Sequence, residues 1–253
     1  ENSAALNVNN ILMGSGVSSD STGNYQSYGV CGRIPPILFE PINNVTKLEG
    51  IFYFCFMVNP YTWPDTTNAG TMYPPNLFAT LRNLTSVKQL FGYNEIPSNI
   101  TLSSSLFVNN LSLQDLDRTW MCCRWYSDAT LPAQVPSDLF SRNGALGNLR
   151  GTFSISSLSV DASDSVTASL YTYGRNPIKV DSNLVTRAKH PNVSNVSYMF
   201  GGCKTTEGTV PELWNWLNKL SLKYRTQPFY QMSKALITNS SGIPAEWSIG
   251  MND

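Results

Sequence analysis

The clearest alternation of hydrophobic and polar residues lies between Gly151 and Gly174, in the stretch GTFSISSLSVDASDSVTASLYTYG. Hydrophobic residues occupy every second position on each side of a slip by one residue at Ser156–Ser157. Because side chains alternate between the two faces of a strand, this period predicts two strands, with a bulge at the slip. The acidic segment Asp161–Asp164 separates the two runs. The stretch is therefore predicted to form a bent antiparallel hairpin.

Three other runs are rich in aromatic and β-branched residues, as strands are. They are LEGIFYFCFMVNP (48–60), SSLFVNNLSL (104–113) and RTWMCCRWYS (118–127). The first run is hydrophobic on both faces, which predicts a central strand covered on both sides. In the third run, a strand would direct Trp120 and Cys122 to one face and Met121 and Cys123 to the other.

One helix is predicted, in TVPELWNWLNKLSLKY (209–224). Thr209 and Glu212 have the spacing of a capping box, and Pro211 suits a first helical turn. Hydrophobic residues follow at helical spacing, at Leu213, Leu217, Leu220 and Tyr224. We expect this stripe to pack against the core or against a partner.

Short strands separated by turns, with no βαβ alternation and no evident internal repeat, predict an all-β fold with an antiparallel sandwich. The Gly- and Ser-rich segment 1–32 contains no Lys or Arg and is expected to be a flexible N-terminal arm that becomes ordered on a partner surface. The predicted organisation is thus an arm over 1–32, a β-sandwich over 33–204, and a C-terminal helix and tail over 205–253.

The surface is expected to be polar but weakly charged, because only 13% of the 253 residues are charged. Seventeen basic and seventeen acidic residues cancel, which argues against strong attraction to nucleic acid or to an anionic membrane. The longest hydrophobic run, Ile51–Val58, is too short for a transmembrane helix. Such a surface suits a protein that packs against neighbours, and equally a polar extracellular β protein.

No catalytic, cofactor-binding or metal-binding residue can be assigned, so the chain is not expected to be an enzyme. The only histidine, His190, lies in a loop-like segment without a nucleophile motif and is interpreted as a surface residue. The close carboxylate pairs, Asp115 with Asp117 and Asp161 with Asp164, are interpreted as turn residues. No zinc spacing, calcium loop or dinucleotide fingerprint is present.

The five cysteines are odd in number and include an adjacent pair, which argues against a disulfide framework. Seven Asn-x-Ser/Thr sequons are present, whereas the composition alone predicts about five. They are weak evidence for secretion. The sequons are at Asn44, Asn83, Asn99, Asn110, Asn192, Asn195 and Asn239.

Aromatic and hydrophobic residues in loops, in the arm and on the helix are the candidates for an interface. The loop Pro60–Pro75 could use its aromatic residues to stack on a sugar, to contact a protein, or to pack back on the fold. The candidates are Tyr25 and Tyr28 in the arm, Tyr61, Trp63 and Tyr73 in the loop, and Trp214, Leu217 and Leu220 on the helix.

With the strands placed, the chain resembles the jelly-roll capsid proteins of picorna-like RNA viruses, particularly those of insects. EGIFYFCFMVNP looks like a central capsid strand, FSISSLSV like the bent strand before the last hairpin, and SVTASLYTYGRNPIKV like the closing strand. The start at Glu1 without Met fits release from a viral polyprotein. The resemblance covers roughly residues 30 to 180.

The resemblance implies a structural protein of a non-enveloped icosahedral virion, with a jelly-roll β-sandwich and no cofactor. Its partners would be copies of itself and sister capsid proteins, in a shell with pseudo-threefold quasi-equivalence, and a host receptor could bind outside. Genomic RNA would be enclosed without strong direct binding, since the chain is neutral. The alternative is a secreted or cell-surface β-sandwich that binds glycan or protein. Glycosylation at several sequons would favour the alternative, and sedimentation as a particle of megadaltons would favour the shell.

Overall fold

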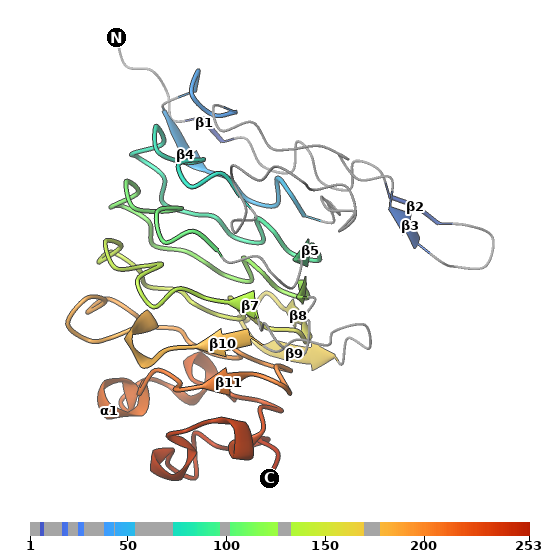
Figure 1. Cartoon of the computed structure of the whole chain (residues 1–253), viewed down its shortest axis with the longest axis vertical. Helices are drawn as coiled ribbons and strands as arrows, with labels where there is room; N and C mark the ends of the chain where they lie inside the picture. The colour runs from blue at the N-terminus through green and yellow to red at the C-terminus, as the bar shows by residue number, and fades with distance from the viewer. Residues whose placement is uncertain are drawn as a thin grey trace.

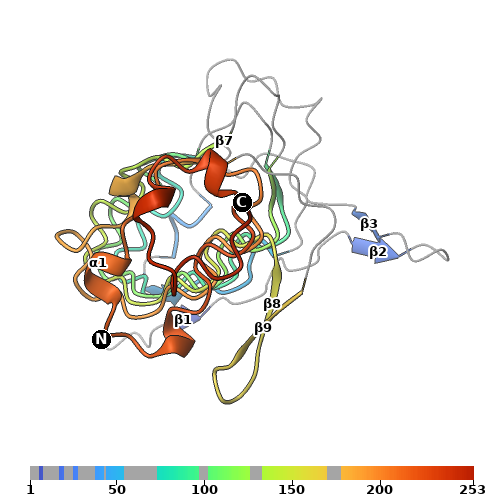
Figure 2. The same ribbon diagram turned by 90° about the horizontal axis from the view of Figure 1, so that it is seen from below.

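The structure is a computed structural model, which describes residues 6–7, 17–19, 25–27, 38–42, 44–53, 73–96, 102–125, 133–169 and 178–253. In these residues the backbone is wound into coils that lie one above another, with the C-terminal segment at the lower end of the stack (Figure 1). Viewed along the stack, the coils superpose as a ring, and the hairpin of β8 (Ser157–Val160) and β9 (Val166–Ser169) extends beyond that ring (Figure 2).

The elements within the coils are short. The strands are β1 (Leu6–Asn7), β2 (Val17–Ser19), β3 (Tyr25–Ser27), β4 (Val45–Lys47), β5 (Glu95–Ile96), β6 (Arg124–Trp125), β7 (Ala133–Gln134), β8 (Ser157–Val160), β9 (Val166–Ser169), β10 (Ile178–Val180) and β11 (Glu207–Gly208). The helices are α1 (Trp214–Leu217) and the 3-10 turns η1 (Ser182–Leu184), η2 (Leu222–Tyr224), η3 (Lys234–Leu236) and η4 (Ser240–Gly242). Most of the described backbone therefore lies in turns that connect these elements.

Neighbouring coils pair in parallel. The strand pairs β1–β4, β5–β6, β7–β10 and β10–β11 are all parallel. A line of single parallel bridges also runs down the stack, through Lys47, Ser86, Asp115, Asn148 and Asn195. Because equivalent residues of successive coils lie next to each other, the arrangement is that of a solenoid, in which each coil buries its hydrophobic face against its neighbours.

Each coil contributes hydrophobic residues at intervals of three. In one coil, Leu84, Val87 and Leu90 are buried, and Phe91 follows directly. Its backbone N–H groups donate to the next coil, from Val87 to Asp115 at 2.9 Å and from Phe91 to Thr119 at 2.8 Å. Buried residues recur with the same spacing in four other coils, with threonine at 119 and 152: at 45, 48, 51 and 52, at 113, 116, 119 and 120, at 146, 149, 152 and 153, and at 193, 196, 199 and 200.

A left-handed residue stands two positions before the aromatic residue of each coil. The φ angles are 66° at Gly50, 55° at Gln89, 57° at Arg118, 58° at Gly151, 52° at Tyr198 and 44° at Gln227. A positive φ interrupts the pleat of a strand, so hydrophobic side chains are not restricted to alternate positions. The left-handed residue lets the backbone of each coil change direction there while its N–H groups still bond to the neighbouring coil.

The core is organised around a column of aromatic rings, with one ring from each coil. Adjacent centroids are 5.6 Å apart for Phe52–Phe91, 5.8 Å for Phe91–Trp120, 5.2 Å for Trp120–Phe153, 5.6 Å for Phe153–Phe200 and 6.2 Å for Phe200–Phe229. All five pairs are stacked, with the largest interplanar angle 21°. Burial of each ring contributes about 1.5–3 kcal/mol, and each ring pair adds about 0.5–1.5 kcal/mol.

The C-terminal segment closes the lower end of the stack. Trp247 is buried, and Ile237 and Ile243 join the same hydrophobic core. The backbone of Asn252 pairs with the last coil, since its N–H donates to the carbonyl of Met232 at 2.8 Å. Contacts such as β10–β11 and Phe200–Phe229 cross the domain boundary expected at 204/205. The tail thus shares its core with the coils.

The hairpin predicted within 151–174 is confirmed over residues 157–169. Residues 151–153 form a turn of the coil and the first strand begins only at Ser157, so the strand predicted around Phe153 and Ile155 and the bulge after it are wrong. Strands β8 and β9 pair antiparallel with Ser157 opposite Ser169, and the N–H of Asp161 donates to the carbonyl of Ser165 at 3.1 Å across the turn. The antiparallel sandwich expected over 33–204 is not seen in the described residues, where the coils pair in parallel. Because parts of 33–204 lie outside the described residues, the jelly roll stays a prediction.

The other predicted elements differ in extent. The run 104–113 forms turns. Of residues 118–125, the described part of the run 118–127, only Arg124–Trp125 is a strand, because Arg118 and Cys122 both have left-handed φ. Trp120 and Cys123 join the main core, whereas Met121 and Cys122 join a second cluster with Leu158, so the predicted two-sided alternation there is wrong. The described part of the run 48–60, residues 48–53, forms a turn of the first coil.

The helix predicted over 209–224 is limited to one turn, α1. The hydroxyl of Thr209 lies 2.7 Å from that of Thr238 and makes no capping bond, and the backbone of Ser221 is extended at ψ 143°. The hydrophobic stripe is nonetheless buried or half-buried against the core.

Candidate functional site: the ionic cluster under the β8–β9 hairpin

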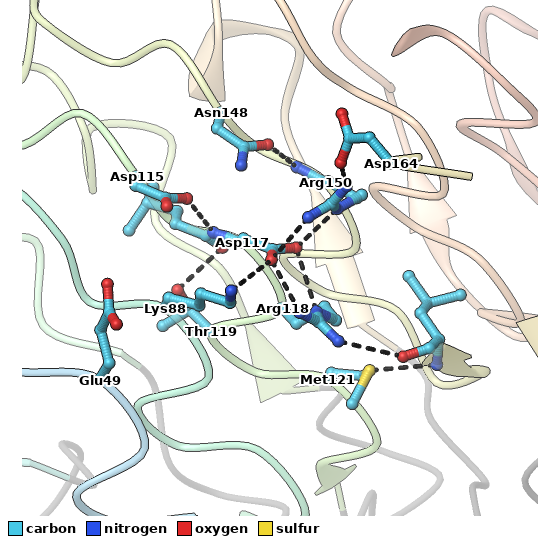
Figure 3. Close-up of polar contacts among 12 residues, drawn as sticks. Glu49, Lys88, Asp115, Asp117, Arg118, Thr119, Met121, Asn148, Arg150 and Asp164 are labelled. Atoms are coloured by element: carbon cyan, nitrogen blue, oxygen red, sulfur yellow. Dashed lines mark hydrogen bonds and ion pairs between the residues drawn. The ribbon is translucent and has the colours of Figure 1, made fainter. Parts of the chain in front are cut away.

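Asp117 is the centre of a buried ionic cluster. Arg150 donates to both of its carboxylate oxygens, with Nε–Oδ1 and Nη2–Oδ2 distances of 2.9 Å. Arg118 donates to the same two oxygens, at 3.2 Å from Nε and 3.0 Å from Nη2. Figure 3 shows the two guanidinium groups converging on this carboxylate. Four charge-assisted hydrogen bonds therefore satisfy one acid.

The cluster results from the coil register. Glu49, Lys88, Asp117 and Arg150 stand at the same position of four successive coils, three residues before the aromatic column, and their charges alternate in sign. Lys88 lies 3.9 Å from Asp117 Oδ2, and Glu49 Oε1 accepts a hydrogen bond from the Ser86 hydroxyl at 2.7 Å. The alternating charges could be recognised from the sequence only after the three-residue spacing of the coils was known.

The electrostatics of the cluster favour its charged form. Burial acts to raise the pKa of Asp117, but the hydrogen bonds from Arg150 and the charge of Arg118 outweigh it, so that this pKa lies below its ordinary value. Burial likewise acts to lower the pKa of Arg150, and the bonds to Asp117 and Asp164 raise it overall. Asp117 is therefore an ionised structural group with little basicity left for proton transfer.

The cluster anchors the β8–β9 hairpin on the side of the stack. Arg118 Nη1 donates to the carbonyl oxygen of Leu158 at 3.2 Å, and Arg150 Nη1 donates to the carboxylate of Asp164. The Leu158 side chain packs with Met121, Cys122 and Tyr198, and its N–H contacts the Met121 sulfur at 3.2 Å. The hairpin is thus fixed by both charge and hydrophobic contact.

The interpretation of the carboxylate pairs as turn residues is confirmed but incomplete. Asp115 Oδ1 accepts the N–H of Asp117 at 2.8 Å, and Asp161 Oδ1 accepts the N–H groups of Ser163 and Ser165 at 2.8 and 2.9 Å. Asp117 and Asp164 also lie in turns: the N–H of Thr119 donates to the carbonyl of Leu116 at 3.1 Å, and Asp164 has a left-handed φ of 65°. Both carboxylates in addition take part in ion pairs, a role that the sequence did not predict. The buried Arg118 and Arg150 were not recognised from the sequence.

His190 is buried, so the prediction of a surface histidine is wrong. Its Nε2 is 2.9 Å from the carbonyl oxygen of Phe140, and its Nδ1 accepts the N–H of Thr186 at 3.2 Å. In the coils above, Asn143 and Asn110 make the equivalent bonds with their amide groups, to the carbonyls of Phe107 and Phe78 at 3.0 Å. His190 takes the place of an asparagine in this ladder, and neither of its nitrogens is available for catalysis.

The described thiols are also unsuited to chemistry. Cys122, Cys123 and Cys203 are free and buried, and burial raises the pKa of Cys122 and of Cys203 to about 12. A thiolate is the nucleophilic form, so these side chains are inert near neutral pH. Within the described ranges, no three His, Cys, Asp or Glu side chains gather in a way that could bind a metal ion.

The described interface candidates lie in the core of the chain itself. Tyr73 is buried and stacks on Phe91 with centroids 3.9 Å apart, and Trp214 packs edge-on against Phe229 at 6.2 Å. Leu217 is buried, and Leu220 is half-buried against the same core. Tyr28, Tyr61 and Trp63 lie outside the described residues, and the structure describes Tyr25 only by its backbone, in β3.

Most of the described sequons have a structural explanation. Asn44, Asn83 and Asn192 are exposed at one position of three coils, and the hydroxyls of Thr85 and Ser194 bond to the coil above at 3.0 and 3.3 Å. Two others are buried: the Asn110 amide belongs to the ladder, and Asn195 Oδ1 accepts the N–H of Ser197 at 3.1 Å. The coil geometry therefore accounts for part of the Asn-x-Ser/Thr pattern.

No protein-family model, curated protein or solved structure matches the chain. None of the helices in the described part of the chain has the length and hydrophobicity needed to span a lipid bilayer.

Proposed function

We propose that this chain is a non-catalytic binding scaffold that recognises another protein through the side surfaces of its coils. The observation that carries the proposal is that the potentially reactive side chains have structural roles. Asp117, His190 and the three described thiols are all buried in the stack. Stacked coils expose long regular surfaces, which solenoid proteins use for binding. The anchored hairpin adds a further element to one such surface.

The hairpin is suited to contact a partner because its base is fixed and its turn is exposed. Residues 161–163, 165, 167 and 169 are exposed, whereas Leu158 is buried at the base. The buried ion pairs hold this segment in one conformation before binding, which reduces the entropy lost on association. The proposal keeps protein binding, which was part of the alternative function predicted from the sequence. The binding surface is now formed by stacked coils and no longer by a β-sandwich.

Photo-cross-linking tests this function. A benzophenone amino acid is placed at Thr167 on the hairpin or at Ser112 on the coils, both of which are exposed. In extract of the source cells, we expect a covalent adduct with one protein, at one of these positions, that disappears when unlabelled chain is added in excess. Only diffuse adducts that unlabelled chain does not compete away would contradict the proposal.

The role in a virion shell stays a prediction that rests on the resemblance alone. The neutral net charge is compatible with both functions. Sedimentation of native material separates them: a particle of megadaltons containing sister chains would support the shell, whereas a species near the 28.0 kDa of one chain would support the scaffold.

A further inference from the structure

One edge of the stack, which we name the asparagine corner, consists of residues 80–83, 109–112, 142–145 and 187–192. The amide ladder holds these turns in register: Asn110 Nδ2 donates to the carbonyl of Leu81 at 2.7 Å, and Asn143 Nδ2 donates to that of Asn110 at 2.9 Å. Asn192 Nδ2 continues the contact, donating to the carbonyl of Gly144 at 3.0 Å. Side chains that leave this corner are therefore presented from a fixed backbone.

The asparagine corner is basic although the whole chain is neutral. Arg82, Arg142, Arg187 and Lys189 are exposed on it, and its four segments contain no Asp or Glu. The nearest acids in the sequence are Asp115, whose carboxylate accepts the N–H of Asp117, and Asp138 and Asp181, which precede the buried Leu139 and Leu184 that lead into the turns. The β8–β9 hairpin, in contrast, carries two acids and no base. Charge is thus segregated between two parts of the stack.

The basic side chains of the corner make no ion pair in the described part of the chain. The ion pairs found there involve Lys88, Arg118, Arg150 and Lys234 as cations. Exposed cations without an intramolecular partner can bind a carboxylate at little cost in free energy, because no existing ion pair must be broken. The exposed Asn83, Asn109 and Asn192 add polar side chains between the charges.

The spacing of the charges fits an extended acidic segment. Arg142 and Lys189 stand in adjacent coils, and neighbouring parallel backbones lie about 4.8 Å apart. Arg82 lies two coils above Arg142 and two positions further along its coil, and the two coils are about 10 Å apart by the same spacing. Side chains on one face of an extended peptide repeat about every 6.6–7 Å, within reach of flexible Arg and Lys side chains.

We infer that the asparagine corner binds an acidic segment of a partner protein. A protein is favoured over nucleic acid because the chain carries no net positive charge, whereas nucleic-acid interfaces commonly neutralise about 6–10 phosphates. Charge complementarity of this kind sets partner choice and association rate. The inference rests on the proposed binding function and names the surface and the partner chemistry.

Fluorescence anisotropy with a labelled peptide of six Glu-Ser repeats tests the inference on the full chain. We expect saturable binding that weakens as salt rises from 50 to 500 mM, since exposed charges are screened. The double variant R142E/K189E should bind at least about tenfold more weakly. The matched control K204E/K219E changes exposed bases outside the corner by the same charge and should change the affinity by less than about twofold.

The inference is overturned if the peptide does not bind, if both double variants lose equal affinity, or if a twelve-nucleotide oligothymidine binds more tightly than the peptide. If R142E/K189E fails to fold, R82Q/R187Q removes charge from the same corner without introducing acids. A partner identified by cross-linking could bind R142E/K189E as tightly as it binds the wild-type chain. That result would refute the asparagine corner as the binding site without contradicting the proposed function.

Discussion

Gly151 shows how a single residue connects the coils to the hairpin. Its φ is +58°, and a Cβ atom there would lie 2.4 Å from Leu158 Cδ1 and 3.1 Å from Arg118 Cγ. Other coils tolerate Gln89 or Tyr198 at the equivalent position with left-handed φ. The demand for glycine therefore comes from both the backbone and the close approach of the hairpin.

Replacing Gly151 by Ala should destabilise the chain by about 1–2 kcal/mol, through left-handed strain and displacement of Leu158. Urea unfolding followed by circular dichroism measures the change. The control is Gly242→Ala, where a Cβ atom would meet no other atom within 4 Å, and its midpoint should match that of the wild type. Equal midpoints for all three proteins would refute the close packing at Gly151.

His190 makes stability depend on pH. Burial lowers its pKa from the ordinary value of about 6.5, so the folded state favours the neutral imidazole. This contribution to stability is fully present above pH of about 6.5 and is lost as the pH falls toward the lowered value, because the unfolded chain binds the proton first.

The variant His190→Asn should remove this pH dependence, since an amide replaces the imidazole without titrating. His190→Ala should cost about 1–3 kcal/mol at pH 8, because the Phe140 carbonyl and the Thr186 N–H lose their partner. Free energies of unfolding at pH 8 and pH 5.5 provide both tests. An unchanged pH slope in His190→Asn would show that other groups cause it.

At the scale of elements, the anchored hairpin depends on Asp117. Replacing Asp117 by Asn leaves the buried Arg118 without a counter-ion and Arg150 with Asp164 alone, and should cost about 3–5 kcal/mol. The pKa of Asp117 is lowered, so its contribution is present above pH of about 4 and is lost as the pH falls through the folded value.

Hydrogen exchange of β8 and β9 is the measurement that locates the effect, and their protection should fall first in Asp117→Asn. The matched control is Asp253→Asn, which breaks the exposed pair with Lys234 and should leave both the midpoint and the exchange unchanged. Full protection of the hairpin in Asp117→Asn would contradict the anchoring role of the cluster.

The hairpin could be predicted from sequence because its period of two is a local signal. The coils could not, because their hydrophobic residues recur every three residues, which is neither a strand nor a helix period. The left-handed residues at Gln89, Arg118 and Tyr198 are not glycines, so nothing in composition marks these turns. The repeat also recurs at unequal intervals, since the β8–β9 hairpin is inserted between two coils.

The candidate site was hidden for the same reason. Asp117 and Arg150 are far apart in the sequence and meet only when equivalent coil positions are stacked. The sequence signal that could have revealed the site is the three-residue spacing of buried positions that ends at an aromatic residue. Aligning the coils on Phe91, Trp120 and Phe153 places the charged residues in one column.

At the scale of the whole molecule, the stacked coils account for the low charge. Each coil buries hydrophobic side chains against two neighbours, and its backbone groups bond to the next coil, so stability does not depend on surface ion pairs. A large exposed surface of Ser, Thr and Asn then remains for binding. This surface is positively charged at the asparagine corner and negatively charged at the β8–β9 hairpin.

The aromatic column provides the most direct test of the stacked coils. In a protein with labelled Phe and Trp rings, nuclear Overhauser spectroscopy should show cross-peaks from the Trp120 indole to the rings of both Phe91 and Phe153, whose centroids lie 5.8 and 5.2 Å away. Contacts from Phe153 to Phe200 should continue the series. A Trp120 indole with cross-peaks to neither Phe91 nor Phe153 would contradict the stacked-coil fold and the binding surfaces derived from it.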